Sequence, residues 1–476
     1  MRGRQWLVRK FRLGTIASIS LAAVLAGCAS FSSDAGMGTV NDVVAPVLKT
    51  DALKVSSDEA AGEAAARTRE LLKSTLSTVS AIRVALLNNK GLQAAYNELG
   101  IAEAVRVEAS LPPSPTFSLS WISTPVELDI ERRIIADILA LATLPARAEI
   151  AAERFHAAQL RAAEETLRVA AEARRSYYRA IAAAQVVTAL VQAASAAETT
   201  TKLAKQLGET GAMNKLDVAR EDAFYADIVT QLDAARQGAV SARERLVRVL
   251  GLTGADLKFK LPQALPALPN RPRALVAVET DAIKRRVDLQ IARVEVDAIA
   301  KSYGLTHATR FLDLLEVAGV SRTQHEASGA SGTGGGAGVD VRVPIFEFGE
   351  ARLRQAGETY MQAVNRLSEK ATNVRSQARE AYQAYRSRYD IAEHYRRDVL
   401  PLRKVISDET MLRYGAMQID VFSLLTEARQ RIAANIAAID AQRDFWLANT
   451  DLDAAIVGGG DSAANGTNSA DTRTND

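Results

Sequence analysis

The chain has 476 residues, of which 48% are hydrophobic and only 5% aromatic, and it carries 59 lysines and arginines against 56 acidic residues. This balanced charge lacks the basic patch that marks a nucleic-acid-binding protein, so we expect no nucleic-acid partner. Sparse aromatic and abundant alanine side chains favour long, closely packed helices over a thick globular core.

The first residues have the pattern of a bacterial export signal. Basic side chains are frequent in residues 2–12, a short apolar stretch covers 13–26, and Cys28 is the single cysteine. The apolar stretch is short for a bilayer span, and one cysteine cannot form an intrachain disulfide. Leu25-Ala26-Gly27-Cys28 resembles the lipobox of bacterial lipoproteins, which implies lipidation of Cys28. A signal peptide with a chance cysteine is the alternative.

We therefore expect a signal peptide over 1–27 and a lipidated N-terminus with a loosely ordered lead-in over 28–74. Ala29-Ser30 lacks the aspartate that typically retains such lipoproteins at the inner membrane. No stretch after Cys28 looks long and apolar enough for a transmembrane helix. If the mature chain crosses a membrane, it is expected to do so as part of a closed β-barrel.

Two segments alternate apolar and polar residues with the period of a β-strand. Residues 116–121 place Phe117, Leu119 and Trp121 on one face, and residues 126–130 continue the alternation. A lipid-facing barrel strand has this pattern, as does a half-buried strand of a soluble sheet. The pattern returns at 339–343, with a less clear partner near 315–321. We expect the glycine-rich residues 328–338 between them to form a flexible hairpin tip.

Proline placement predicts very long helices after each strand pair. No proline lies between Pro145 and Pro262, or between Pro344 and Pro401, so prolines are expected to bracket the helices. Apolar residues in steps of three and four form a coiled-coil seam in both regions, which a soluble helical bundle would also have. Pro401 is expected to bend the second long helix.

Several short matches recur at a nearly fixed offset. Arg147, Arg174 and Tyr177 recur as Arg352, Arg379 and Tyr382, at an offset of 205 (352 − 147). Leu92-Gln93 recurs as Leu289-Gln290 at 197 (289 − 92), so the second copy has about eight extra residues (205 − 197), which we assign to the glycine-rich tip. The repeats are predicted at 75–265 and 266–455, before a disordered polar tail at 456–476.

Each repeat reads as helix, β-hairpin, long helix, tight turn and long helix. The predicted fold class is therefore mainly α with a small membrane β part and an internal two-fold repeat. Four strands per chain are too few to close a barrel, and an open sheet edge in lipid is costly. If the strands lie in a membrane, several chains must contribute to one barrel.

This arrangement resembles the TolC-like outer-membrane efflux protein family over roughly 75–455. The resemblance is carried by the lipobox, the repeat and the hairpins, and by three strings: residues 85–94, Leu111-Pro112-Pro113-Ser114-Pro115 and Arg286-Val287-Asp288-Leu289-Gln290. It implies a homotrimer in a Gram-negative bacterium, with a 12-stranded barrel in outer-membrane lipid and a coiled-coil helical tunnel in the periplasm. It also implies a passive exit duct for tripartite efflux or type I secretion, with a periplasmic adaptor and an inner-membrane transporter as partners.

The two turns between long helices are the candidate functional residues. The resemblance implies adaptor contacts at Gly211, Ala212 and Met213, which match Gly415, Ala416 and Met417 at an offset of 204 (415 − 211), and a pore narrowed near Asp217 and Asp420. Locally, glycine suits a helix C-terminus and aspartate a helix N-terminus, so capping alone also explains them. The second turn is one residue shorter between glycine and aspartate, which counts against Asp420 in a constriction.

No residue pattern indicates chemistry. Met213 and Met417 could bind a soft metal, although an apolar tip that docks a partner explains them better. The four histidines are scattered without ligand spacing, and no nucleophile motif is present. We therefore expect no enzyme activity, no metal site and no cofactor beyond the N-terminal lipid. The competing function is a periplasmic coiled-coil structural or adaptor-like lipoprotein without a channel.

Overall fold

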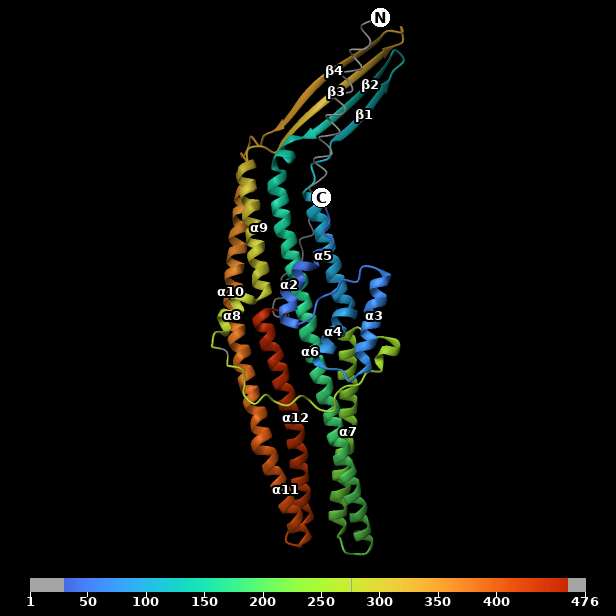
Figure 1. The fold of residues 1–476 in the computed structure, drawn as a ribbon, viewed down its shortest axis with the longest axis vertical. Coiled ribbons are helices and arrows are strands. Elements are labelled where there is room, and N and C mark those ends of the chain that lie inside the picture. The colour runs from blue at the N-terminus through green and yellow to red at the C-terminus, as the bar shows by residue number, and fades with distance from the viewer. Residues whose placement is uncertain (1–29, 275, 461–476) are drawn as a thin grey trace. The chain divides into compact units, whose positions relative to one another are not determined.

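The computed structural model describes residues 30–274 and 276–460. The predicted signal peptide, Cys28 and the tail from residue 461 lie outside the described residues. The elements, in chain order, are α2 (Met37–Leu48), α3 (Asp58–Lys73), α4 (Thr78–Asn88), α5 (Lys90–Ala109), β1 (Thr116–Ser123), β2 (Glu127–Asp137), α6 (Ile138–Glu209), α7 (Lys215–Leu250), η1 (Gly254–Leu257), α8 (Val278–Arg285), α9 (Val287–Thr309), β3 (Leu314–Glu326), β4 (Ser331–Arg342), α10 (Glu350–His394), η2 (Tyr395–Val399), α11 (Leu400–Gly415) and α12 (Val421–Val457) (Figure 1).

The element order confirms a mainly helical chain with four strands. The first half runs α5, β1, β2, α6, α7, and the second runs α9, β3, β4, α10 to α11, α12. The described chain forms two compact units. Unit 1 contains residues 30–39, 97–161 and 289–370, and unit 2 contains residues 40–96, 162–288 and 371–460. The predicted repeats 75–265 and 266–455 each contribute to both units.

Unit 1 contains one antiparallel sheet with the strand order β1-β2-β3-β4 (Figure 1). The prediction of a flexible tip at 328–338 is wrong, because β4 begins at Ser331 and pairs with β3 from His325 to Leu314. Only residues 327–330 turn the chain. The hydrogen bonds between paired strands involve backbone groups alone. A glycine-rich segment without alternating side chains can therefore still pair with β3. The extra residues lengthen the strands, since the second hairpin spans 314–342 and the first 116–137.

Helix α6 also differs from its prediction. It begins at Ile138, directly after β2, and contains Pro145. Prolines therefore do not bracket this helix, because the loss of one backbone donor near its start is compatible with a 72-residue helix. Among the described residues, α6 is also long and apolar enough, by length and composition, to cross a membrane. On that criterion the expectation of no such stretch is wrong, although the core helix of a soluble protein meets the same criterion.

A π-helical turn, η2, separates α10 from α11. The backbone N–H of Leu400 donates to the carbonyl oxygen of Tyr395, five residues back, and Pro401 follows directly. A π-turn accommodates one inserted residue, and proline has no N–H to continue the ordinary ladder. A one-residue insertion thus lies directly before Pro401, where the sequence predicts a bend.

Unit 2 has an aromatic core where α6, α10 and α12 meet. Tyr178 stacks on Trp446 with ring centres 5.3 Å apart, and the Phe445 ring lies 5.5 Å from Tyr385 and 5.7 Å from Tyr389. The lead-in 28–74, predicted to be loosely ordered, contains α2 and α3, and Val40 and Val44 of α2 are fully buried. Apolar side chains at positions three and four apart explain that order.

Candidate functional site

The first of the two turns between long helices joins α6 to α7 within unit 2. Gly211 has φ +76°, and the N–H of Ala212 donates to the carbonyl oxygen of Leu207 at 2.8 Å. Asn214 caps α7, its side chain accepting from the backbone N–H of Asp217 at 2.9 Å. A left-handed glycine that closes a helix is therefore confirmed at this turn.

The second turn, from α11 to α12, uses a different residue. Gly415 is the last residue of α11, and the left-handed position is taken by Met417, with φ +58°. The N–H of Gln418 donates to the carbonyl oxygen of Arg413. Asp420 is the N-cap of α12. Gly415, a glycine at a helix C-terminus, is expected to close the helix, but Met417 supplies the left-handed residue because the turn closes two residues later.

The two turns correspond in backbone conformation and capping at an offset of 206, not 204. Gly211 corresponds to Met417 (417 − 211), and the caps Asn214 and Asp420 correspond as well (420 − 214). Three hydrogen bonds match at this offset, since Thr210 and Ala416 donate four residues back, Gly211 and Met417 three, and Ala212 and Gln418 five. The Gly-Ala-Met match is therefore out of structural register. The step from 205 to 206 coincides with the residue inserted at η2.

Both predicted aspartates lie at helix starts but in different positions. Asp420 is the N-cap of α12 and accepts from the N–H of Ser423 at 2.9 Å, and its hydrogen bonds with Ser423 hold its pKa below the usual range. Asp217 lies three residues after the cap Asn214, and its carboxylate contacts Asn214 at 2.7 Å and Arg220 at 3.1 Å. Capping is thus confirmed for Asp420 only, because Asn214 and not Asp217 caps α7, and the structural equivalent of Asp217 is Ser423.

The tip methionines have different surroundings. Met213 packs against the apolar cluster that joins α6, α7 and α12, whereas the side chain of Met417 is 94% exposed. The described residues contain no group of three histidine, cysteine, aspartate or glutamate side chains that could hold a metal.

The two helical hairpins of unit 2 pack on each other through an apolar cluster. Its buried members are Leu190, Ala194, Ala197, Phe224, Ile228, Leu232, Val421 and Leu425. Two arginine–aromatic contacts flank this cluster. Arg220 of α7 lies 5.3 Å from the centre of the Phe422 ring, and Arg429 of α12 lies 5.4 Å from that of Phe224. Cationic and apolar contacts thus hold the hairpins together.

The corrected offset reveals a pair of buried carboxyls that sequence reasoning missed. Glu221 and Glu427 differ by 206 (427 − 221), are 4% and 8% exposed, and each has one buried oxygen without a hydrogen bond among the described residues. Glu427 pairs with Arg403 at 3.1 Å. The equivalent of Arg403 in the first hairpin is Ala197 (403 − 206), so Glu221 has no such partner. Burial raises the pKa of Glu221.

We expect opposite effects from neutralising these two carboxyls. Glu221→Gln should stabilise the α6–α7 hairpin near pH 7, because the raised pKa means that stability is highest in acid and is lost as the pH rises through that pKa. Glu427→Gln should destabilise its hairpin by about 1 kcal/mol through the weakened bond to Arg403. Hydrogen exchange of hairpin amides at pH 5 and pH 7, corrected for intrinsic rates, measures both. Equal effects at the two positions would contradict the assignment.

A reciprocal swap tests the left-handed position. Met417→Gly should stabilise the second turn by about 0.5–1 kcal/mol, because a side chain at positive φ costs more than the freedom of glycine. Gly211→Met should destabilise the first turn by a similar amount, since a Cβ there meets nothing within 4 Å and only backbone strain acts. Exchange rates of the turn amides give the readout, with Met417→Leu as the control that should change nothing.

The sheet of unit 1 has two chemically different faces. Phe117, Leu119 and Trp121, which are 72%, 58% and 69% exposed, share one face with Ile130 and Ile134. The register continues that face across β3 and β4 through Leu315, Val317, Val339 and Val341. Polar residues interrupt this face at Arg132, which donates to Thr323 at 3.2 Å, and toward the turn of the second hairpin at Ser321, Thr323, His325, Ser331 and Thr333. An exposed apolar face at the three predicted positions is therefore present.

The other face of the sheet is polar. Asp129 and Glu131 of β2 share it with Arg322 of β3, whose Nε lies 2.9 Å from Asp129 Oδ1. On β4 this face carries glycines at alternate positions, namely Gly332, Gly334, Gly336 and Gly338. One side of the sheet is thus apolar over β1, most of β2 and the ends of β3 and β4 next to their helices, and the other side is charged and partly free of side chains.

Comparison with known proteins agrees with this geometry. Residues 279–405 match the family model described as outer membrane efflux protein. The fold is similar to CusC, described for transmembrane channel formation (TM-score 0.68, 17% identity, 80% of this chain and 92% of that chain). It is also similar to the CmeC outer membrane channel of Campylobacter jejuni (0.67, 14%, 81% and 86%) and the outer membrane protein VceC of Vibrio cholerae (0.66, 14%, 83% and 96%). No curated protein matches the chain.

Proposed function

Because residues 279–405 match the outer membrane efflux protein family and the chain has the fold of TolC-like outer-membrane channels, we propose that three copies form the passive exit duct of a tripartite efflux system. Substrates would enter from an inner-membrane transporter with its periplasmic adaptor and leave across the outer membrane. The duct supplies a path and no chemistry of its own.

The two-faced sheet is the observation that carries this proposal. Strands β1 and β4 are the edges of a four-stranded sheet, so each leaves a row of backbone groups without a partner in the single chain. In lipid such edges are costly, and closure with neighbouring copies satisfies them. Closure with the apolar face outward would place Leu119 against lipid and Asp129 and Arg322 around a wet lumen.

The helical tips are the proposed adaptor-docking surface, comprising Gly211, Ala212 and Met213 on one turn and Gly415, Ala416 and Met417 on the other. Met417 supports this assignment, because a strained left-handed residue with an exposed apolar side chain contributes nothing visible to the chain's own packing. Asp217 and Asp420 are proposed as the acidic groups nearest the narrow end of the pore, in addition to the contact of Asp217 with Arg220 and the capping bond of Asp420. Met417→Gly should then weaken adaptor binding while stabilising the turn.

Lipidation of Cys28 is proposed as the anchor at the outer membrane. Its chemical test is independent of channel activity. Cys28→Ser should abolish incorporation of labelled palmitate, whereas Ser30→Ala, a change two residues away, should leave incorporation intact. Labelling of the Cys28→Ser chain would contradict lipidation at this residue.

Purified mature protein in detergent gives the decisive test of the duct. We expect three-fold particles with a membrane belt at one end in negative-stain electron microscopy, and discrete conductance steps in planar bilayers. Unbelted particles without conductance would overturn the proposal. They would favour a periplasmic coiled-coil or adaptor-like lipoprotein, for which the long helices and their coiled-coil seams already provide the scaffold.

A further inference from the structure

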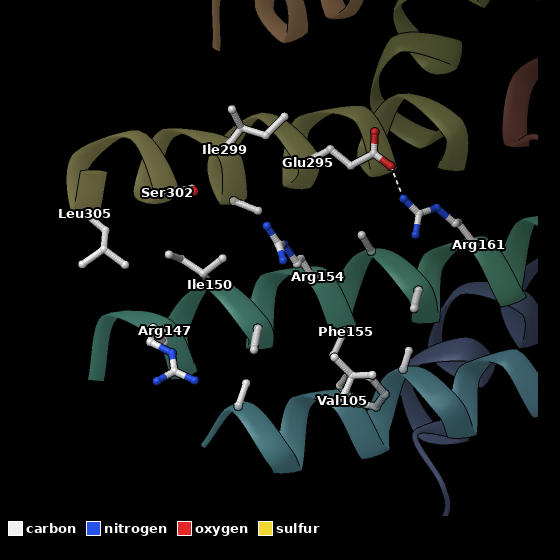
Figure 2. Close-up of a pocket in the computed structure, with 16 residues that line it drawn as sticks. Val105, Arg147, Ile150, Arg154, Phe155, Arg161, Glu295, Ile299, Ser302 and Leu305 are labelled. Carbon is white, nitrogen blue, oxygen red and sulfur yellow. Dashed lines mark hydrogen bonds and ion pairs between the residues drawn. The ribbon is translucent and has the colours of Figure 1, made fainter. Parts of the chain in front are cut away.

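A groove of about 710 Å³ lies in unit 1 between α5, α6 and α9. Figure 2 shows Ile150 of α6 pointing toward α9 and Phe155 of α6 beside Val105 of α5, and Ile299 of α9 also lines the groove. The walls are therefore largely apolar. None of the predicted site residues lies in this groove.

Three arginines border the groove at a constant spacing on α6. Arg147, Arg154 and Arg161 are seven residues apart, which is about two helical turns, so they project from the same side of the helix. Figure 2 shows Arg154 in the space between α6 and α9, and Arg161 paired with Glu295. Arg147 and Arg154 have no ion pair or hydrogen bond among the described residues.

Neighbouring charges do not neutralise these two guanidiniums. Lys301 of α9 is the next cation, and it is held by Glu149 at 2.7 Å and Glu153 at 2.8 Å. At 100° per residue, those two carboxylates project from a different side of α6 than Arg147 and Arg154. Arg147 and Arg154 are both exposed residues, so two unpaired positive charges remain where the apolar walls meet solvent.

We propose that this groove binds amphiphilic anions, molecules with a phosphate, sulfonate or carboxylate head on an apolar body, and that these are cargo passing along the duct. The head group would pair with Arg147 or Arg154, while the body lies on Ile150, Phe155 and Ile299. The two guanidiniums start about 10 Å apart along the helix, so they offer successive positions for one head group. The assignment of the ligand as cargo rests on the proposed function, whereas the binding chemistry does not.

The binding test uses the full mature chain in nanodiscs of uncharged lipid, with 1-anilinonaphthalene-8-sulfonate as the fluorescent probe. Dodecyl sulfate should displace the probe, and dodecyltrimethylammonium, which has the same tail and the opposite charge, should not. Arg147→Gln with Arg154→Gln should weaken probe binding by about ten-fold or more. The control pair Arg236→Gln with Arg245→Gln, on α7, should leave it unchanged. The proposal would be overturned if the probe bound the groove double variant as tightly as the control double variant. Equal displacement of the probe by the two surfactants would also overturn it.

Two further arms separate the alternatives. If nanodiscs containing an anionic phospholipid suppress probe binding in the native chain, the occupant is a membrane lipid and the cargo assignment is overturned. Conductance of the native chain in planar bilayers reports on the duct itself. Conductance without charge-selective binding would refute the groove alone, and charge-selective binding without conductance would refute the duct alone.

Discussion

Leu119→Lys should prevent the chain from assembling in the outer membrane, whereas Ser120→Lys, one residue further along β1, should allow assembly. Leu119 is exposed on the apolar face between Phe117 and Trp121, and an ammonium on a lipid-facing strand costs about 2–4 kcal/mol near the bilayer midplane. Three copies would carry that cost three times, and the new ammonium would lie opposite Arg132. Ser120 points to the polar face, opposite Glu131, where a lysine gains a partner.

The measurement is the fraction of protein recovered as trimer from urea-washed outer membranes, compared with native protein at equal expression. Phe117→Lys should behave as Leu119→Lys does. Normal assembly of both lysine variants at Phe117 and Leu119 would show that this face does not contact lipid. Failure of Ser120→Lys alone would mean that the two faces of the sheet have been assigned the wrong way round.

The alternation of apolar and polar side chains predicted strands only in segments whose residues have such side chains. Residues 116–121 and 126–130 alternate apolar and polar groups, and they cover most of β1 and the start of β2, which continues to Asp137. The glycine-rich stretch after Ser331 has no such pattern, and its composition is typical of a flexible loop. It becomes a strand because β3 offers a continuous row of backbone donors and acceptors, a tertiary contact that no local property of the sequence reveals.

At the two turns between long helices, a repeated sequence motif predicted the wrong pairs of equivalent residues. Gly-Ala-Met recurs in the sequence at an offset of 204. The backbone hydrogen bonds and the left-handed φ angles instead make Met417 the structural equivalent of Gly211. The inserted residue at η2 shifts the register, and a helix interior gives little local signal for a π-turn. Once the offset is 206, Glu221 and Glu427 become equivalent, and their burial is a fact of packing alone.

The groove arginines were visible in the sequence but could not be distinguished from ordinary surface charges. Seven-residue spacing places Arg147, Arg154 and Arg161 on one side of a helix, as it does for any solvent-exposed row in a coiled coil. Their significance depends on which partners the fold supplies. Glu295 of α9 neutralises Arg161, and no equivalent carboxylate reaches the other two among the described residues.

Gly349→Ala should destabilise unit 1 more than any other single methyl addition between β4 and α10. Gly349 has φ +75°, and a Cβ there would overlap the backbone carbonyl of Arg310 at the end of α9. The left-handed conformation costs alanine about 1–2 kcal/mol, and overpacking adds about 1–3 kcal/mol. Neither cost can be relieved by a side-chain rotation, because the obstructing atoms belong to the main chain.

Gly357→Ala is the matched control, since it adds the same methyl group two turns later in α10. A Cβ at that position meets the Tyr303 ring at 3.6 Å, an ordinary contact, and alanine favours a helix over glycine by about 1 kcal/mol. The thermal unfolding midpoint of the purified protein should therefore fall for Gly349→Ala and stay level or rise for Gly357→Ala. A Gly349→Ala protein that unfolds at the native temperature would mean that the β4–α10 loop shifts freely away from Arg310, and that this junction does not fix how the sheet joins its helices.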